Sequence, residues 1–181
     1  GKHIICYVKE QGLFCFDDRK QEFVSLKNDL PDDIRNFVID SKDRIFFLTG
    51  HGQLLHYQLT VRNSCPELSF KEEIRHCAPV SNIYLSQDCL IINDDRTLTV
   101  SQDNRILDSI NIPENKTVSQ AICHGEYLLI SFIEGGCIRY NLENGTSTEL
   151  LQLPEKASIF TIYIGSQNIL WVGTDGQGIL E

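Results

Sequence analysis

Short apolar runs recur along the chain, and each is followed by a turn rich in glycine or aspartate and then by a second short run. The clearest copy is residues 169–181, ILWVGTDGQGILE, which aligns without gaps on residues 45–57 and on residues 128–140. Residues 4–16 form a weaker copy. Apolar runs of this length, joined by turns that accept a positive φ, are typical of β-hairpins. The pattern therefore predicts a hairpin at each of these places.

The hairpins recur at a nearly constant spacing. Their equivalent positions are Gly12, Leu54, Cys137 and Gly178, which are separated by 42, 83 and 41 residues. The middle interval is two periods, and residues 89–100 supply the copy between them. A period of this length with only strand-like content is typical of a four-stranded β-propeller blade. A β-sandwich is the rival architecture, but it has no reason to repeat its sequence at this interval. We therefore predict an all-β propeller.

Each hairpin is flanked by further strand-like runs. Those before it are 34–39, 80–85, 118–123 and 159–164, and those after it are 22–26, 68–74, 106–112 and 147–153. Prolines, which cannot donate to a strand ladder, mark the passage between units at Pro31, Pro79, Pro113 and Pro154. The predicted blades are about 2–30, 31–78, 79–112, 113–153 and 154–181, with three, four, four, four and three strands. The tips are expected at Gly50–Gln53, Glu134–Gly136 and Asp175–Gln177.

Strands of this number make about four and a half blades of four strands each. The two ends do not each supply one strand of a shared blade, so we expect residues 1–181 to be part of a larger propeller of the seven-bladed type. Its partners would then include further blades of the parent chain. Unpaired blade edges would also be able to pair between chains.

The last copy has a more specific pattern than the others. Residues 168–180 read as an aliphatic-Trp-aliphatic-Gly-Thr run, a polar turn and a glycine before a final aliphatic pair. This segment resembles the two-component regulator propeller repeat, and the matching residues are Trp171, Gly173, Thr174, Gly176 and Gly178. The earlier copies keep the period but, at the tryptophan position, have Phe47, Ile130 and Ile5.

The resemblance implies a function as well as a fold. Such repeats form periplasmic sensor regions of bacterial hybrid two-component histidine kinases anchored in the inner membrane. It therefore implies an extracytoplasmic sensor that responds to a carbohydrate-derived signal, with the kinase in the parent protein and no enzyme activity in this chain. A general protein-interaction propeller is one alternative, and a polysaccharide-cleaving propeller enzyme is another.

Composition narrows the range of partners. The net charge is −9 and the isoelectric point is near 5.0, with no cluster of lysine and arginine. This argues against nucleic acid, whose phosphates require such clusters. No apolar run approaches the roughly 20 residues of a membrane-spanning helix, so we expect no direct membrane contact. An oligosaccharide or another small ligand remains the expected partner.

Trp171 and the turn after it are the first candidates for a ligand site. Trp171 stands in the middle of an apolar run, which favours a buried wedge between blades over a platform that stacks on sugar rings. Residues Thr174–Gln177 form a hairpin tip, where threonine and aspartate commonly hydrogen-bond their own turn. Hairpin tips and interblade loops are expected on one side of each blade, which is therefore the place to seek a ligand.

Other polar residues do not assemble into a recognisable centre. The five histidines lack metal-site spacing, so we expect no metal or cofactor; they are His3, His51, His56, His76 and His124. Asp94 and Asp95 are adjacent on one turn, whereas a glycosidase needs two carboxyls facing each other, and Glu134 lies far from them in the sequence. The sequence thus predicts no catalytic residue and identifies no ligand-binding one.

The seven cysteines include no CxxC pair, which argues against zinc and thioredoxin-like sites. Most lie in apolar runs, where cysteine acts as a small hydrophobic residue. Cys65 and Cys77 flank one predicted strand and are either free thiols or a disulfide, because spacing alone does not reveal the required geometry.

Overall fold

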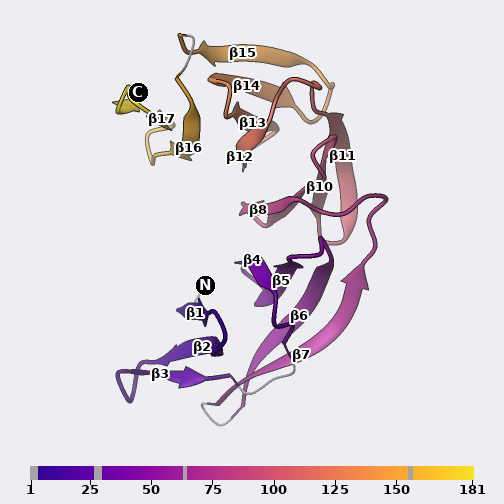
Figure 1. Cartoon of the computed structure of the whole chain (residues 1–181), viewed down its shortest axis with the longest axis vertical. Coiled ribbons are helices and arrows are strands. Elements are labelled where there is room, and N and C mark those ends of the chain that lie inside the picture. Colours follow the sequence, from indigo (N-terminus) through magenta and orange to yellow (C-terminus); the bar gives the residue numbers. More distant parts are fainter. Residues whose placement is uncertain (1–3, 27–29, 63–64, 155–156) are drawn as a thin grey trace. The chain divides into compact units, whose positions relative to one another are not determined.

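The computed structural model describes residues 4–26, 30–62, 65–154 and 157–181. Within these ranges the regular structure is antiparallel β-strand, and no helix occurs there (Figure 1). In the described part of the chain, eighteen strands form five sheets, in each of which strands consecutive in sequence are neighbours. The all-β architecture of three- and four-stranded antiparallel sheets is confirmed.

The sheets follow one another along the chain. The first contains β1 (Ile5–Val8), β2 (Gly12–Asp17) and β3 (Glu22–Ser25), and the second β4 (Ile34–Ile39), β5 (Arg44–Thr49), β6 (Leu54–Arg62) and β7 (Cys65–Ile74). The third contains β8 (Asn82–Ser86), β9 (Cys89–Asn93), β10 (Thr97–Gln102) and β11 (Arg105–Asn111). The fourth contains β12 (Val118–His124), β13 (Tyr127–Phe132), β14 (Gly136–Asn141) and β15 (Ser147–Gln152), and the last β16 (Ile159–Ile164), β17 (Leu170–Thr174) and β18 (Ile179–Leu180).

The chain divides into two compact units, residues 1–83 and 84–181, with the boundary inside β8. In the first unit, Leu13 and Cys15 of the first sheet pack against side chains of the second sheet that include Phe47 and Tyr57. These four side chains are at most 6% exposed. The alternating apolar pattern of the strands therefore buries one face of each sheet against its neighbour.

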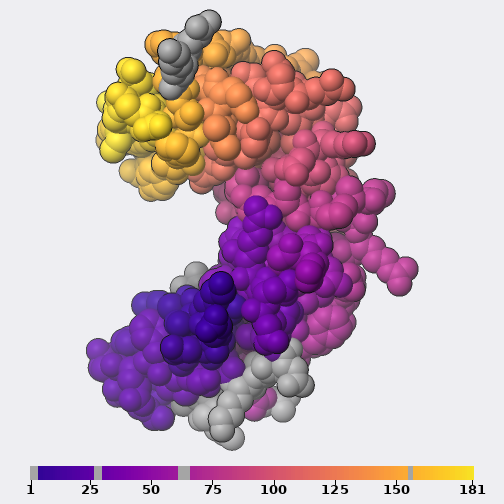
Figure 2. Space-filling model, viewed as in Figure 1, coloured from indigo at the N-terminus to yellow at the C-terminus, as the bar shows by residue number. Residues whose placement is uncertain are grey.

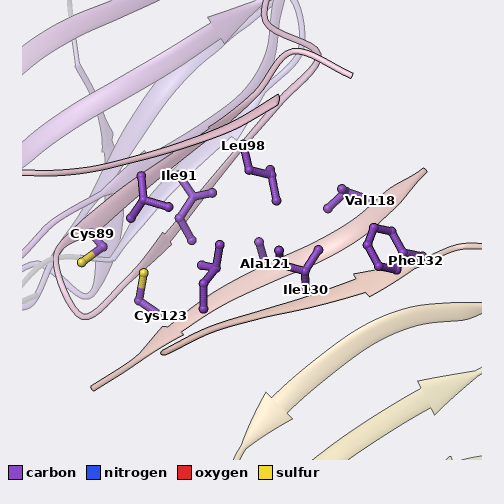
Figure 3. Close-up of a cluster of buried hydrophobic side chains, with 10 residues drawn as sticks. Cys89, Ile91, Leu98, Val118, Ala121, Cys123, Ile130 and Phe132 are labelled. Carbon is purple, nitrogen blue, oxygen red and sulfur yellow. The ribbon is translucent and has the colours of Figure 1, made fainter. Parts of the chain in front are cut away.

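The second unit has two such cores. One lies between the third and fourth sheets and contains Ile91, Leu98 and Ile130 (Figure 3). The other lies between the fourth and last sheets and contains Leu129 and Val172. Because neighbouring residues of β13 face opposite sides, this strand is buried on both faces, which explains its continuous apolar sequence.

Polar contacts accompany these cores where first strands of successive sheets adjoin. In the first unit, Asn36 Nδ2 of β4 donates to Asn82 Oδ1 at 2.9 Å and to the carbonyl of Ile83 at 3.2 Å. In the second unit, Gln120 Oε1 of β12 accepts from Thr161 Oγ1 and from the Ile162 N–H, both at 2.8 Å. Asn36 and Gln120 occupy equivalent positions, because each follows the bulge of its strand.

We expect Gln120→Ala to lower the free energy of unfolding by about 1–2 kcal/mol, because it removes both acceptor contacts and leaves the N–H of buried Ile162 without this partner. Urea denaturation would measure the loss. Gln102→Ala, which changes an exposed glutamine of the same unit, should alter stability by less than about 0.5 kcal/mol. Equal losses for the two variants would contradict this role of Gln120.

Candidate binding surface at the hairpin tips

The tips between second and third strands lie beside the segment that enters the same sheet. The N–H of Gly50 donates to the Asp33 carbonyl at 2.8 Å. The same contact recurs from Ile133 to Thr117 at 2.8 Å and from Asp175 to Ser158 at 2.9 Å. In these three sheets, tip and entering segment thus share one end of the sheet, as expected for loops that could together contact a ligand. We call this end the tip end of each sheet.

The tip end of the second sheet carries open polar groups. His51 Nε2 lies 3.7 Å from Asp33 Oδ2, and their side chains are 86% and 41% exposed. Gln53 Nε2 donates to Glu73 Oε1 at 3.2 Å. These groups supply hydrogen-bond donors and acceptors to solvent, but their exposure leaves them fully hydrated. They are suited to weak recognition of a polar ligand and not to acid-base catalysis.

Glu134 belongs to the tip end of the fourth sheet. Its Oε2 accepts the N–H of Thr117 at 2.8 Å. Partial burial by itself would raise the pKa of this carboxyl, but the hydrogen bonds from Thr117 and the nearby Lys116 ammonium outweigh it and lower the pKa. Glu134 is therefore a carboxylate that holds the entering segment against the tip. It is not placed as the acid of a hydrolytic pair.

Asp94 and the tip of the last sheet are likewise occupied by local structure. Asp94 Oδ1 accepts the N–H groups of Arg96 and Thr97 at 3.0 and 2.7 Å. Thr174 Oγ1 donates to the Gly178 carbonyl at 2.8 Å. These contacts follow the usual behaviour of aspartate and threonine in turns. The expectation that residues 174–177 serve local structure agrees with the observed contact.

Trp171 lies on the other face of its strand from the one that the sequence alignment implied. The last residues of the second strands, Thr49, Phe132 and Thr174, are equivalent because each pairs with the first residue of the first strand of its sheet. The residues three positions before them are therefore equivalent too, and these are Phe46, Leu129 and Trp171. The alignment had instead placed Trp171 beside Phe47 and Ile130. Because side chains alternate, this slip of one residue moves Trp171 to the opposite face.

Leu129, at the equivalent position, packs between two sheets, whereas in the last sheet the predicted burial is not observed for Trp171. The side chain of Trp171 is 39% exposed and pairs across the strands with Tyr163, which is 65% exposed. The slip arises at the turn. Gly52 and Gly135 are the third residue after their second strand, whereas Gly176 is only the second. Alignment of the turn glycines consequently shifts the strand by one position.

The new position changes the expected effect of Trp171→Ala. A buried large aromatic residue costs about 3–5 kcal/mol when truncated, but half-exposed Trp171 should cost only about 1 kcal/mol. Ile130→Ala, in the same unit and 2% exposed, should cost about 2–5 kcal/mol. Chemical denaturation of both variants measures the difference. A loss at Trp171 as large as that at Ile130 would show that the ring is buried in solution.

The histidines are distributed over separate surroundings. His51 is exposed at a tip, whereas His56 is 7% exposed, stacks on Phe46 at a centroid distance of 5.0 Å and has Nδ1 3.4 Å from Glu72 Oε1. His3 lies outside the described residues. Among the residues that the structure describes, no three histidine, cysteine or acidic side chains gather in a way that could hold a metal ion.

The cysteines divide into exposed and buried thiols. Cys77 is a free, exposed thiol, and the side chain of Cys65 lies outside the described residues. Cys89 and Cys123 are both buried in the core between the third and fourth sheets, and a side-chain hydrogen bond joins them. Burial raises the pKa of both thiols, and it raises the pKa of Cys137 to about 11. Buried cysteines thus serve as small core residues, as their apolar surroundings in the sequence predict.

One buried ion pair could not be recognised from any motif in the sequence. Asp40 directly follows the first strand of the second sheet, and its side chain is fully buried. It accepts the N–H groups of Lys42 and Arg44 at 2.9 Å, and Arg44 Nε donates to its second oxygen at 2.5 Å. A lone aspartate four residues before an arginine is a weak signal, because such pairs are common on surfaces.

Comparison with known proteins supports the fold and one repeat. Residues 152–176 match the family described as two component regulator propeller. No curated protein matches the chain. Among solved structures, a chain of "Crystal structure of BBS1N in complex with ARL6DN, soaked with lead" matches with a TM-score of 0.68 at 12% identity. The match covers 98% of this chain and 54% of that chain, so this chain spans about half its length.

At this identity the likeness shows the fold alone, and that fold agrees with the five antiparallel sheets. No helix long and apolar enough to cross a membrane is found in the described part of the chain. The resemblance seen in the last copy is supported by the family match, which ends at Gly176 within the tip of the last sheet. The chain is therefore an all-β series of propeller blades, and residues 152–176, which reach into the last blade, match the two component regulator propeller repeat.

Proposed function

We propose that this chain is a ligand-sensing propeller segment of a two-component signalling protein. In this proposal it lies outside the cytoplasm, responds to a carbohydrate-derived signal and leaves catalysis to a histidine kinase elsewhere in the parent protein. The observation that carries the proposal is the match of residues 152–176 to a regulatory propeller repeat. A repeat of this description has a regulatory and not a catalytic role.

The tip ends support a binding role. In the second, fourth and last sheets a backbone hydrogen bond joins the tip to the entering segment and so keeps the two loops side by side. The second sheet presents Asp33, His51 and Gln53 there, and such side chains can hydrogen-bond sugar hydroxyl groups. Glu134 holds the entering segment against its tip and Asp94 holds its own turn, which argues against the alternative of a polysaccharide-cleaving enzyme.

A general protein-interaction propeller is the second candidate. It is favoured by large exposed apolar side chains on the last sheet, Phe160 and Tyr163 among them. Exposed apolar groups of this kind commonly mark contact with another protein.

Calorimetric titration with a panel of neutral and acidic oligosaccharides would test the sensing proposal on this chain and on the full native protein. We expect the full protein to bind one class, and this chain to bind it with a dissociation constant weaker than about 1 mM, because a ligand shared among many blades would meet only part of its site. His51→Ala and Asp33→Asn should weaken binding, whereas Glu149→Gln, an exposed strand residue, should not.

Binding by neither protein would remove support for a glycan signal and favour a protein partner. Release of new reducing ends from the oligosaccharides would instead contradict the non-catalytic role.

A further inference from the structure

Two buried thiols of the second unit come from different sheets and meet in one core. Cys89 is the first residue of β9 in the third sheet, and Cys123 is the last but one residue of β12 in the fourth. They are 7% and 2% exposed. Both belong to the core between these two sheets, which adjoin in the space-filling view (Figure 2). A side-chain hydrogen bond joins the two thiols.

The backbone on both sides of this pair is held by further hydrogen bonds. Ser86 Oγ, at the end of β8, donates to the Cys123 carbonyl at 2.9 Å. The N–H of Gly125 donates to Gln87 Oε1 at 3.0 Å. These contacts hold the turn that precedes Cys89 against the strand end that carries Cys123. The packing of the two sheets therefore brings the two cysteines together.

The other buried cysteines have different surroundings. Cys15 lies in the core of the first unit, and Cys137 lies in the core between the fourth and last sheets. Each is the single cysteine among the described residues of its core, so it serves there as a small apolar side chain. The core between the third and fourth sheets contains two cysteines, the number that a disulfide requires.

We propose that Cys89 and Cys123 form a disulfide that joins the third sheet to the fourth when the chain meets an oxidising small disulfide. The bond closes the loop from residue 89 to residue 123, which includes the last three strands of the third sheet. Closure of such a loop removes many conformations of the unfolded chain. The disulfide therefore stabilises the contact between two blades.

The oxidation proceeds by two exchange steps, with oxidised glutathione as the oxidant. The Cys89 thiolate attacks one sulfur of the glutathione disulfide, which forms a mixed disulfide and releases one glutathione thiolate. The Cys123 thiolate then attacks the Cys89 sulfur, which closes the protein disulfide and releases the second glutathione thiolate. The two thiol protons of the protein pass through water to the two released thiolates. Two protein thiols are thus oxidised, and one glutathione disulfide is reduced.

Cys89 is the thiol that reacts first. Burial raises the pKa of both thiols, but their hydrogen bond counteracts this rise at Cys89 and adds to it at Cys123. The thiolate therefore forms more readily at Cys89, which is also the more exposed of the two. Because the pKa of both groups stays raised, we expect the exchange to be slow in the folded chain.

Refolding from urea in equal concentrations of reduced and oxidised glutathione tests the proposal, because every thiol is accessible before the cores form. Remaining thiols are then alkylated, and chymotrypsin is used to cleave at Tyr84 and Tyr127. These cuts separate Cys89 from Cys77 and Cys123 from Cys137. Mass spectrometry should find the Cys89 peptide joined to the Cys123 peptide as the main disulfide of the second unit, with Cys137 alkylated.

Cys123→Ala and Cys137→Ala are matched variants, because each removes one buried thiol of the second unit. Oxidation should raise the urea midpoint of the wild type and of Cys137→Ala by about 1 M or more. It should not raise the midpoint of Cys123→Ala. Dithiothreitol should reverse the rise wherever it occurs.

Three results would overturn the proposal. The first is a refolded chain in which Cys89 and Cys123 are both alkylated. The second is a chain in which either of them is joined mainly to another cysteine. The third is an equal rise in the urea midpoint of Cys123→Ala.

Formation of the bond in cells rests on the proposed location outside the cytoplasm, where disulfides persist. Alkylation of the full native protein during cell lysis tests that location separately from the pairing. We expect the two cysteines to be protected from alkylation there until dithiothreitol is added. Reduced cysteines in the cell, together with a disulfide on refolding, would contradict the location and leave the pairing established.

Discussion

Gly135→Ala is expected to lower the free energy of unfolding by about 2–5 kcal/mol. Gly135 has φ +86°, where a side chain costs about 1–2 kcal/mol. A Cβ built there would lie 2.5 Å from the backbone oxygen of Ala157 and 3.3 Å from Leu153 Cβ. Relief of this overlap requires the tip to separate from the segment that leads to the last sheet, and overpacking adds about 1–3 kcal/mol.

Gly176→Ala is the matched control for Gly135→Ala. Gly176 has φ +82° but nothing within 4 Å of its added Cβ, so it should show only the backbone cost of about 1–2 kcal/mol. Both positions are in the second unit, and urea denaturation compares them directly. Gly52→Ala should resemble Gly135→Ala, because its Cβ would lie 2.8 Å from Pro79 Cβ. Equal losses at Gly135 and Gly176 would show that the contact with Ala157 is unimportant.

Asp40→Ala is expected to cost about 3–5 kcal/mol, the range for removing one partner of a buried ion pair. The change leaves the Arg44 side chain, itself only 14% exposed, without its carboxylate. It also removes the acceptor for the Lys42 and Arg44 N–H groups that close the turn between β4 and β5. Thermal and urea denaturation would report the loss.

Asp40→Asn separates these two contributions. The amide oxygen of the asparagine can still accept the two turn N–H groups. Asp40→Asn should therefore lose less stability than Asp40→Ala but should be less stable than the wild type. Asp175→Ala, at an exposed tip, should change stability by less than about 0.5 kcal/mol. A loss at Asp40→Ala no larger than that at Asp175→Ala would mean that Arg44 finds an equivalent partner in solution.

Much of the fold was predictable from the chain alone. The predicted bounds of the first strands at 34–39 and 159–164 coincide with β4 and β16, and the predicted strand numbers per sheet agree with the structure. This success has a local cause. Alternating apolar residues and turn glycines determine where a strand can form, and a repeat presents the same information several times. The predicted tip at 50–53 coincides with the observed one for the same reason. The last tip, 175–178, is one residue longer than the predicted 175–177, and the middle tip, 133–135, lies one residue earlier than predicted.

The candidate surfaces were less predictable, because they depend on contacts between distant residues. Sequence reasoning placed tips and entering segments on one side of a blade, but not Asp33 beside His51 or Thr117 beside Glu134. The two residues of each pair are not related by the sequence repeat, so the repeat could not predict that they lie together. The burial of Asp40 could not be predicted for a similar reason, because its neighbours in the sequence do not distinguish it from a solvent-exposed aspartate in a turn.

By itself, the sequence determined the strands, their hairpins and the repeat, because these depend on residues close together in the chain. Tertiary structure alone decided the register of the last copy and hence the face on which Trp171 lies. The turn glycines of residues 169–181 align with those of the earlier copies, but Gly176 stands one place nearer its strand than Gly52 or Gly135. Strand pairing with β16 sets the true register, and because side chains alternate, one residue decides on which face of the last sheet Trp171 lies.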